Sequence, residues 1–339
     1  MESAMSLRIE NPVAKVFGFW EYQQPAPPKK IEPIKIDDGN RKAKTAAERY
    51  FVERFPMEII FMILFLLDFP SLEELRLVNT TFKGLVESIA EYRFLREYAY
   101  EAVLMMCRTH ISSYYTIKDI YNELRYPLCR TCPEFGPFLH LPTLRRCCYK
   151  CNAEDPSYRL ARLCDLRVYF HLKDFRDIPL INCMLQPGTY IASVSRSMEI
   201  VGKLYGPDKA QQIMEANELQ GEGSDEGGNH FWMEDLRNDG GQPSNRSRIP
   251  WGELGTPWMQ FRATAPFPYY DHTKGPVEHG TYCRTCCGDF GRELEHTRDI
   301  GNARKWEYYR AFRETELSLH WLECHAEDAS EDSSSQELA

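Results

Sequence analysis

The sequence has no long hydrophobic run and no excess of positive charge. Its longest uninterrupted apolar stretch is Ile59 to Leu67, nine residues, whereas a membrane-spanning helix needs about 20. The segment MESAMSLRIE at the start contains no apolar core of the kind found in secretory signals. The formal net charge of −9 argues against broad electrostatic binding to nucleic acid or to an anionic membrane. These absences predict a soluble protein of the cytoplasm or nucleus whose partner is neither a membrane nor a nucleic acid.

Motifs of common catalytic sites are also missing. HExxH and GxSxG do not occur, and the GEG at 221–223 has neither a preceding strand nor a following GK[ST] with which to bind phosphate. His325-Ala326-Glu327 spells the H-x-E of zinc deaminases. That chemistry requires a cysteine pair after this element, and no cysteine follows Glu327 here. The sequence therefore predicts a protein without catalytic activity of its own.

What the sequence does contain is twelve cysteines, six of them in C-x-x-C pairs. Cys129 and Cys132 form the first pair, and Cys148 and Cys151 form the second. Two intervening residues let a tight turn aim both sulfurs at one point about 2.3 Å away, and two such turns complete a tetrahedral zinc site. We therefore expect a structural Zn²⁺ ion here. Only Cys148, and not Cys147, keeps the two-residue spacing.

A redox role is the competing interpretation of these pairs. Thioredoxin-type pairs lie within a βαβ unit, and no such unit surrounds these cysteines. In a reducing compartment disulfides do not persist, so clustered cysteines there more often bind metal.

A second zinc site is predicted near the end of the sequence. Cys283 and Cys286 form a third C-x-x-C pair, and a run that reads as one long helix extends from about Arg292 to His325. His320 and Cys324 lie four residues apart on that run, so both project from one helix face. These four side chains would complete a site of three cysteines and one histidine. Incidental His and Cys at an exposed helix end is the competing interpretation. The alternative ligands are Cys287, His279 and His296.

Basic residues surround the first cysteine cluster and face one acidic residue, Glu134. Such a bias marks a surface for nucleic acid or an acidic partner, or it compensates the net charge of about −2 that four thiolates and one Zn²⁺ carry. We favour compensation. The basic residues are Arg125, Arg130, Arg145, Arg146 and Lys150.

The stretch from Phe55 to Val86 carries more apolar surface than its short helices can bury among themselves. Pro56 suits the first turn of a helix, and the apolar run that follows ends at Asp68 and Pro70. Because the run is apolar on nearly every face, one face must meet something outside this small unit. An ordinary core helix of a larger domain is the competing interpretation.

Two further helices are predicted in this stretch. Ser71 and Glu74 have the S-x-x-E spacing of a capping box, which predicts a helix from Leu72 to Val78. Asn79 and Thr80 offer side-chain acceptors for a third helix start.

This stretch resembles the F-box motif throughout its length, with phenylalanine at position 55 in place of the usual leucine. The residues that carry the resemblance are Phe55, Pro56, Glu58, Ile59, Ile60, Ile63, Leu67, Leu72, Leu75, Val78, Phe82 and Leu85. The resemblance implies an α-helical module that docks on the Skp adaptor of cullin–RING (SCF) ubiquitin ligases. Its implied contact residues are Phe55, Pro56, Ile59, Ile60, Ile63, Leu64, Leu67, Leu72, Leu75, Val78 and Phe82.

The rest of the sequence is similar to a group of fungal F-box-like proteins with a cysteine-rich C-terminal region. The similarity lies in LPTLRRCCYKC, the PGTY turn, MEIVGKLYGPDKA, and YCRTC followed by HWLEC. It implies structural zinc at Cys129, Cys132, Cys148, Cys151, Cys283, Cys286, His320 and Cys324.

The predicted fold class is mainly α: an N-terminal three-helix F-box, then a helical, loop-rich region braced by one or two structural zinc sites. We expect one helix from Ser88 to Arg108 and a second that Thr116 and Asp119 cap. We divide the sequence into a linker tail (1–44), the F-box (45–90), connecting helices (91–128), a four-cysteine zinc element (129–151), a helical region (152–220), a flexible insertion (221–250), a second zinc-braced region (251–325) and an acidic disordered tail (326–339).

These features predict a non-catalytic adaptor of a cullin–RING ubiquitin ligase that presents a client protein for ubiquitination. The client would be held near a ubiquitin-loaded enzyme, so that proximity accelerates transfer. The alternative is a zinc-stabilised F-box scaffold that acts outside a ligase. The sequence does not identify the client.

Overall fold

The computed structural model describes residues 6–7, 55–170, 177–182, 190–208, 211–212, 263–273, 275, 277–286 and 309–325. The chain groups into two compact units, residues 1–155 with 261–339 and residues 156–260. The predicted insertion (221–250) and acidic tail (326–339) lie outside the described residues, as does the predicted linker tail (1–44) except for Ser6 and Leu7. Among the described helices, none combines the length and apolar character that crossing a membrane requires.

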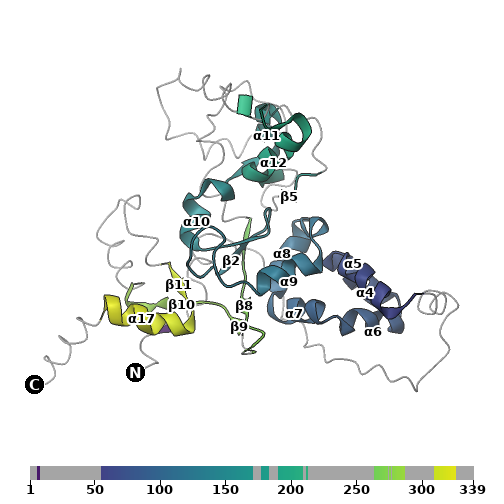
Figure 1. The fold of residues 1–339 in the computed structure, drawn as a ribbon, viewed down its shortest axis with the longest axis horizontal. Helices are drawn as coiled ribbons and strands as arrows, with labels where there is room; N and C mark the ends of the chain where they lie inside the picture. Colours follow the sequence, from purple (N-terminus) through teal and green to yellow (C-terminus); the bar gives the residue numbers. More distant parts are fainter. Residues whose placement is uncertain are drawn as a thin grey trace, which may run out of the picture. The chain divides into compact units, whose positions relative to one another are not determined.

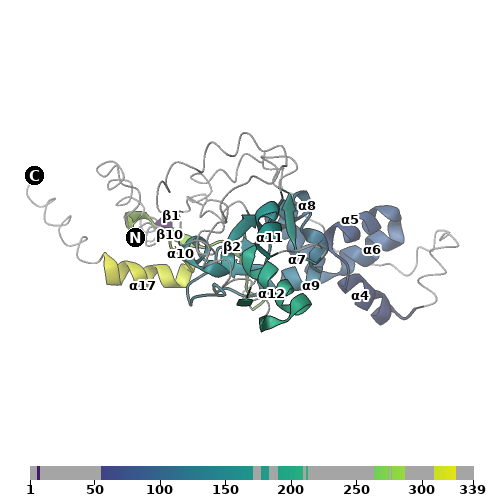
Figure 2. The ribbon, with the colours of Figure 1, turned by 90° about the horizontal axis from the view of Figure 1, so that it is seen from above.

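The apolar stretch forms the three predicted helices, α4 (Met57–Phe65), α5 (Phe69–Val78) and α6 (Thr80–Ser88). α5 and α6 lie side by side (Figures 1 and 2). The predicted cap of α6 is confirmed, since Asn79 Oδ1 accepts a hydrogen bond from Phe82 N at 2.8 Å.

The predicted capping box of α5 is wrong. Asp68 caps this helix instead and accepts a hydrogen bond from Ser71 N at 2.9 Å, so the helix begins three residues before the predicted start. The physical reason is that Pro70 fits a first helical turn, where its missing N–H is not needed, and that Asp caps a helix as well as Ser.

The single helix predicted from Ser88 to Arg108 is two helices, α7 (Ala90–Tyr98) and α8 (Tyr100–Arg108). The chain leaves helical geometry at Ala99, which is buried, and the bend lets the apolar faces of both helices meet one core. A 3₁₀ turn, η2 (Ser112–Tyr114), precedes α9 (Ile117–Leu124). The predicted capping pair of α9 is confirmed, because Thr116 and Asp119 bond each other's backbone N–H groups.

The described part of this unit also contains two small sheets and one hairpin, which the mainly-α prediction missed. One sheet has the antiparallel order β3 (Arg145–Cys147), β2 (Phe138–His140) and β7 (Thr264–Pro266), and α10 (Tyr149–Glu154) follows β3. The second has the order β1 (Ser6–Leu7), β10 (Thr281–Cys283) and β11 (Ala311–Phe312). A hairpin joins β8 (Tyr269–Tyr270) to β9 (Val277–Glu278).

The long helix predicted from Arg292 to His325 is wrong in its described part. Ala311 and Phe312 form β11, and only α17 (Glu314–Cys324) is helical among residues 309–325. Pairing of Tyr282 with Ala311 holds this segment extended, and Arg313 is the N-cap of the helix that follows.

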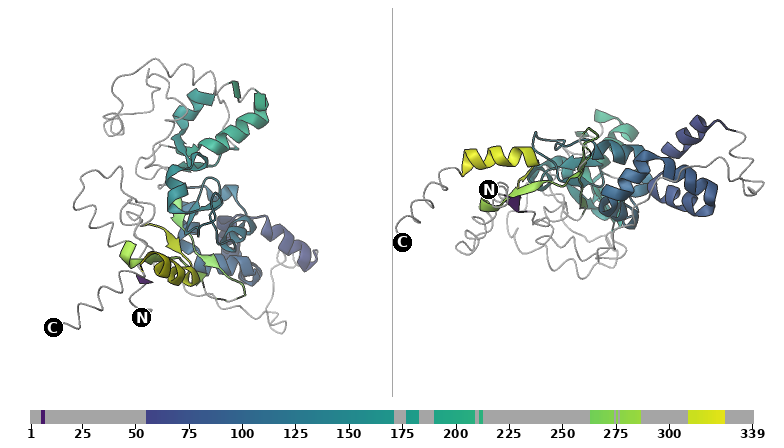
Figure 3. Two further views of the ribbon diagram at one scale, coloured as in Figure 1. Left: turned by 60° about the vertical axis from the view of Figure 1, so that its left-hand side comes forward. Right: turned by 90° about the horizontal axis from the view of Figure 1, so that it is seen from below.

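In its described residues the second unit is a small α/β layer rather than the helical region predicted for 152–220. It contains η3 (Pro156–Tyr158), β4 (Leu160–Arg162), α11 (Leu163–Phe170), β5 (Leu180–Asn182), β6 (Tyr190–Ser193) and α12 (Val194–Tyr205). The antiparallel strand order is β4-β6-β5. Helices α11 and α12 lie side by side (Figures 1 and 3) and share a core with the sheet, in which Leu166, Phe170 and Val201 are fully buried.

Candidate partner surface and metal centres

An exposed apolar stripe runs along α4. Ile60 and Leu64 face the core and are buried. On another face, Ile59, Met62, Ile63 and Leu66 are exposed by 40%, 63%, 39% and 75%. Their spacing of i, i+3, i+4 and i+7 places these four side chains, the α4 stripe, on one side of the helix.

The predicted Skp-contact residues divide into three groups in this structure. Phe55, Pro56, Ile59, Ile63 and Val78 are exposed; Leu67, Leu75 and Phe82 are half-buried; Ile60, Leu64 and Leu72 are buried. The exposed group can contact a partner directly, and the buried group holds the helices together.

The sequence prediction missed four exposed apolar residues of the stretch that resembles an F-box. They are Met57, Met62, Leu66 and Leu77, with 37%, 63%, 75% and 77% of each side chain exposed. Three- and four-residue spacing from Ile59 would have identified Met62 and Leu66. The sequence alone did not show which face of the all-apolar run packs inward.

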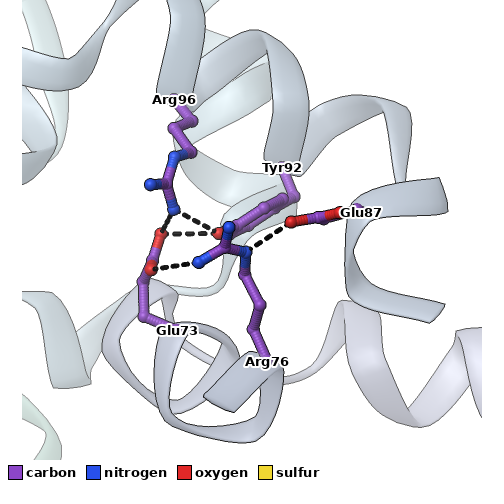
Figure 4. A network of polar contacts seen from close by, with 5 residues as sticks. All are labelled: Glu73, Arg76, Glu87, Tyr92 and Arg96. Atoms are coloured by element: carbon purple, nitrogen blue, oxygen red, sulfur yellow. Dashed lines mark hydrogen bonds and ion pairs between the residues drawn. The ribbon is translucent and has the colours of Figure 1, made fainter. Parts of the chain in front are cut away.

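A polar network joins α5, α6 and α7 (Figure 4). Tyr92 donates a hydrogen bond to Glu73 at 2.5 Å and accepts one from Arg96 at 2.9 Å, while Arg96 also binds Glu73. Arg76 bonds the buried Glu87 at 2.6 Å. Burial, together with the hydrogen bond to Glu73, raises the pKa of Tyr92 above its ordinary value. The network therefore supports the helices behind the stripe through partly buried, charge-assisted hydrogen bonds.

The four cysteines of the predicted first zinc site lie together. The sulfurs of Cys129, Cys132, Cys148 and Cys151, the first cluster, all lie within 4.8 Å of one another. Cys132 Sγ and Cys148 Sγ are 3.6 Å apart, and tetrahedral Zn–S bonds of about 2.3 Å would place sulfurs about 3.8 Å apart. Four ligands close such a site and leave no position for a substrate. Cys147 lies outside the cluster, buried in β3 opposite Phe138.

Backbone geometry aims these sulfurs. In the first turn, Cys129 Sγ accepts a hydrogen bond from Thr131 N at 3.4 Å. In the second, Cys148 is the N-cap of α10, and its Sγ accepts from Cys151 N at 3.4 Å. Backbone N–H groups directed at sulfur stabilise thiolates, which are the form that binds metal.

The thiols of the first cluster cannot all ionise by themselves. A hydrogen bond from Cys148 lowers the pKa of Cys129 to about 4. Burial raises the pKa of Cys132 and Cys151, and the hydrogen bond to Cys129, followed by burial, raises the pKa of Cys148. A bound divalent cation would supply the positive charge that lets all four lose their protons. The donor set and the spacing therefore fit Zn²⁺.

Two of the nearby basic residues have structural partners rather than a free surface. Arg146 is fully buried and donates to the carbonyl oxygens of Gly136, Phe267 and Pro268 at 2.6 to 2.8 Å. Glu123 of α9 accepts hydrogen bonds from Arg146 N at 3.2 Å and from Arg130 Nη2 at 2.5 Å. These contacts fix both cysteine turns to the end of α9.

The second group of candidate metal ligands differs from the prediction at one residue. Cys283, Cys286, His320 and His325, the second cluster, place one ligand atom each within 4.8 Å of one another. The predicted ligand Cys324 is exposed and lies outside the cluster. The physical reason is that α17 ends at Cys324, and His325 has left helical geometry, with φ −135°. Of the alternative ligands, His279 lies outside the cluster, and Cys287 and His296 lie outside the described residues.

The sulfurs and nitrogens of the second cluster also fit a tetrahedral ion. Cys286 Sγ lies 3.5 Å from His320 Nε2 and 3.2 Å from His325 Nε2, close to the separation of about 3.6 Å that Zn–S and Zn–N bonds imply. A hydrogen bond from Cys286 lowers the pKa of Cys283 to about 4. The Phe312 ring stacks on His320 at 4.3 Å and orients it.

Residues 52–94 match the family described as F-box domain. A search of curated proteins and a search of solved structures each found no match. The resemblance of the apolar stretch to the F-box is confirmed, while the similarity of the remaining chain to fungal F-box-like proteins stays a prediction. The chain thus contains an F-box domain, which supports a role as an F-box protein, a class of generally non-catalytic adaptors that typically serve as substrate receptors of SCF ubiquitin ligases.

Proposed function

We propose that this chain docks through its F-box on the Skp adaptor of a cullin–RING (SCF) ubiquitin ligase and presents a client protein for ubiquitination. The observation that carries the proposal is the α4 stripe, four apolar side chains on one helix face of a domain that matches the F-box family. Side chains of this kind on one face are typical of a helix that packs against a partner.

The size of the α4 stripe supports a specific contact. Fully burying one exposed Leu, Ile or Met side chain contributes about 1.5–3 kcal/mol. Scaled by their exposed fractions, the four side chains would contribute about 3–6 kcal/mol before the cost of association. The stripe would therefore be a central anchor of the interface, and the exposed Phe55 and Val78 would extend it.

We further propose that the first cluster holds one structural Zn²⁺ ion. Such an ion would hold the two cysteine turns together at the ends of the segment 129–151, and its binding energy would add to the stability of the fold. Reduced cysteines at this site fit the cytoplasm or nucleus, where we place the protein. In this proposal the chain forms no covalent bond with its client, and ubiquitin transfer occurs on other subunits.

Substitution in the α4 stripe tests the docking proposal. We expect Ile63→Asp to weaken capture of purified Skp adaptor by about 100-fold or more, because an unpaired carboxylate would be buried against apolar surface. The zinc content should stay unchanged, since Ile63 lies on α4 and the cysteines do not. Leu204→Asp is the matched control, because Leu204 is 54% exposed on α12 of the other unit.

Three outcomes separate the hypotheses. Loss of Skp-adaptor capture by Ile63→Asp, with capture retained by Leu204→Asp, supports docking through the α4 stripe. Unaltered capture by Ile63→Asp would refute it. Capture of the Skp adaptor without co-purification of a cullin would favour the alternative, an F-box scaffold that acts outside a ligase.

A further inference from the structure

The two cysteine clusters lie on elements that share a small core. Phe135 follows the first C-x-x-C turn and packs against Tyr282 and Ala311, from β10 and β11. Tyr282 is adjacent to Cys283, a member of the second cluster. The side chain next to the first cluster therefore supports the strand that delivers a ligand to the second.

A glycine preserves this contact. Gly280 precedes β10 with φ +85°, and a Cβ there would lie 2.9 Å from Phe135 Cε1 and 3.1 Å from Ala311 Cβ. Any larger residue would push Phe135 away from the sheet, and the positive φ would strain it further.

Two weaker contacts bridge the same elements. Arg310, just before β11, pairs with Glu134 at 3.3 Å, and the Tyr309 ring lies 4.8 Å from the ring of Tyr149 in α10. The ion pair is partly exposed and contributes little by itself. The aromatic contacts supply most of the linkage.

Among the residues that the structure describes, little else supports the elements that carry the second cluster. Strands β10 and β11 are three and two residues long. The core beneath α17 consists of the buried residues Cys283, Phe312 and Leu317, with Cys286 partly buried against them. Segments with so little buried apolar surface fold when a metal or a preformed neighbour holds them.

We propose that Cys283, Cys286, His320 and His325 form a second Zn²⁺ site, that His325 rather than Cys324 completes it, and that it forms on the platform made by the first site. The inference rests on zinc in the first cluster. In the assembled site the C-cap of α17 supplies the fourth ligand. The ion then fixes α17 to β10, just as Phe135 fixes β10 to the first cysteine turn.

Metal counting on the full chain tests the ligand assignment. We expect two zinc ions per wild-type chain, two for Cys324→Ser, one for His325→Ala, and two again for His325→Cys, which restores a ligand. One ion in Cys324→Ser with two in His325→Ala would show that Cys324 is the ligand. Two ions in both variants, or one ion in the wild type, would also overturn the assignment.

The same samples separate this inference from the proposed function. His325→Ala should keep the first ion and capture the Skp adaptor as the wild type does. Loss of both ions in His325→Ala would overturn the order of assembly, because the first site would then depend on the second. A wild-type chain with no zinc would refute the first site as well.

Phe135→Ala tests the platform while keeping all eight ligands. Titration with Co²⁺, which takes the same kinds of ligand, against a coloured chelator gives the affinity of each site. We expect the second site of Phe135→Ala to bind about tenfold or more weakly, the usual range for coupled sites. Leu319→Ala is the control, because Leu319 is 58% exposed on α17. Equal second-site affinity in Phe135→Ala and wild type would overturn the platform.

Discussion

The substitution Gly136→Ala would test how the buried Arg146 holds the first cysteine turn. A Cβ at position 136 would lie 2.5 Å from Arg146 Cγ, 3.0 Å from its Cδ and 3.1 Å from Cys129 N. Real Cβ atoms do not approach other atoms to 2.5 Å, so one of these groups must move. The Arg146 side chain is fully buried, and the close atom of Cys129 is its backbone nitrogen. Neither group can therefore move without losing contacts.

The cost follows from what Arg146 would lose. Its guanidinium donates to carbonyl oxygens on the loop after the first cysteine turn, on α9 and on the segment after β7, at 2.6 to 3.1 Å. A hydrogen bond to a charged group contributes about 1.5–3 kcal/mol, and displacement of the side chain would break one or two of them. Alanine restricts the unfolded chain more than glycine does, and this effect stabilises the folded state by about 0.4–1 kcal/mol. We expect a net loss of about 1–5 kcal/mol, depending on whether one or two bonds break.

Urea unfolding with zinc present would measure this loss. Gly84→Ala is the control, because Gly84 lies inside α6 and a Cβ there would meet no atom within 4 Å; replacing this helical glycine should stabilise the chain by about 0.5–1 kcal/mol. If Gly136→Ala were as stable as the wild type, Arg146 would not be fixed as described. If both variants lost stability equally, the effect would not come from close packing at position 136.

Two further substitutions test the helices behind the α4 stripe. Tyr92→Phe removes the hydroxyl that bonds Glu73 and Arg96, and we expect a loss of about 1–2 kcal/mol in urea unfolding at pH 7. Folding raises the pKa of Tyr92, so the phenol ionises first in the unfolded chain as the pH rises above about 10. The difference in free energy of unfolding between wild type and Tyr92→Phe should therefore shrink above that pH, and a constant difference would contradict the environment described for Tyr92. Asn79→Ala removes the cap of α6 and should cost about 1 kcal/mol in the same measurement, whereas Thr80→Ala, exposed at the first position of that helix, should cost less than about 0.5 kcal/mol; equal losses would contradict the cap.

Features set by neighbouring residues could be predicted from the sequence. Asn79 caps α6, and Thr116 with Asp119 caps α9, because a cap needs only its own side chain and the next turn. The cysteines of the first cluster were predicted for the same reason, since each turn brings its own two sulfurs together. Two nearby residues can still compete to cap the same helix: Asp68 caps α5, three residues before the predicted cap Ser71.

Features that depend on distant partners could not be predicted. β2 pairs with β7, whose residues lie more than a hundred positions away, and each strand has three residues, too few for a readable alternation. Arg146 was predicted to be one of several basic residues that compensate the charge of the first cluster, but the sequence did not show that it is buried among the carbonyl groups of residues 136, 267 and 268. The fourth ligand of the second cluster depends on where α17 ends, and one residue decides between Cys324 and His325.

Helix α9 connects the proposed docking surface to the first cysteine cluster. At its start, Ile117 N donates to the carbonyl oxygen of Leu67, just beyond α4, at 3.3 Å. Near its end, Glu123 binds Arg130 and Arg146, which lie within or beside the two cysteine turns. A rigid eight-residue helix with bonds at both ends transmits orientation between the elements it joins. In the proposed receptor, zinc at the first cluster would therefore help to set the direction in which the rest of this unit extends from the docked F-box, and this direction determines where a client can lie for ubiquitin transfer.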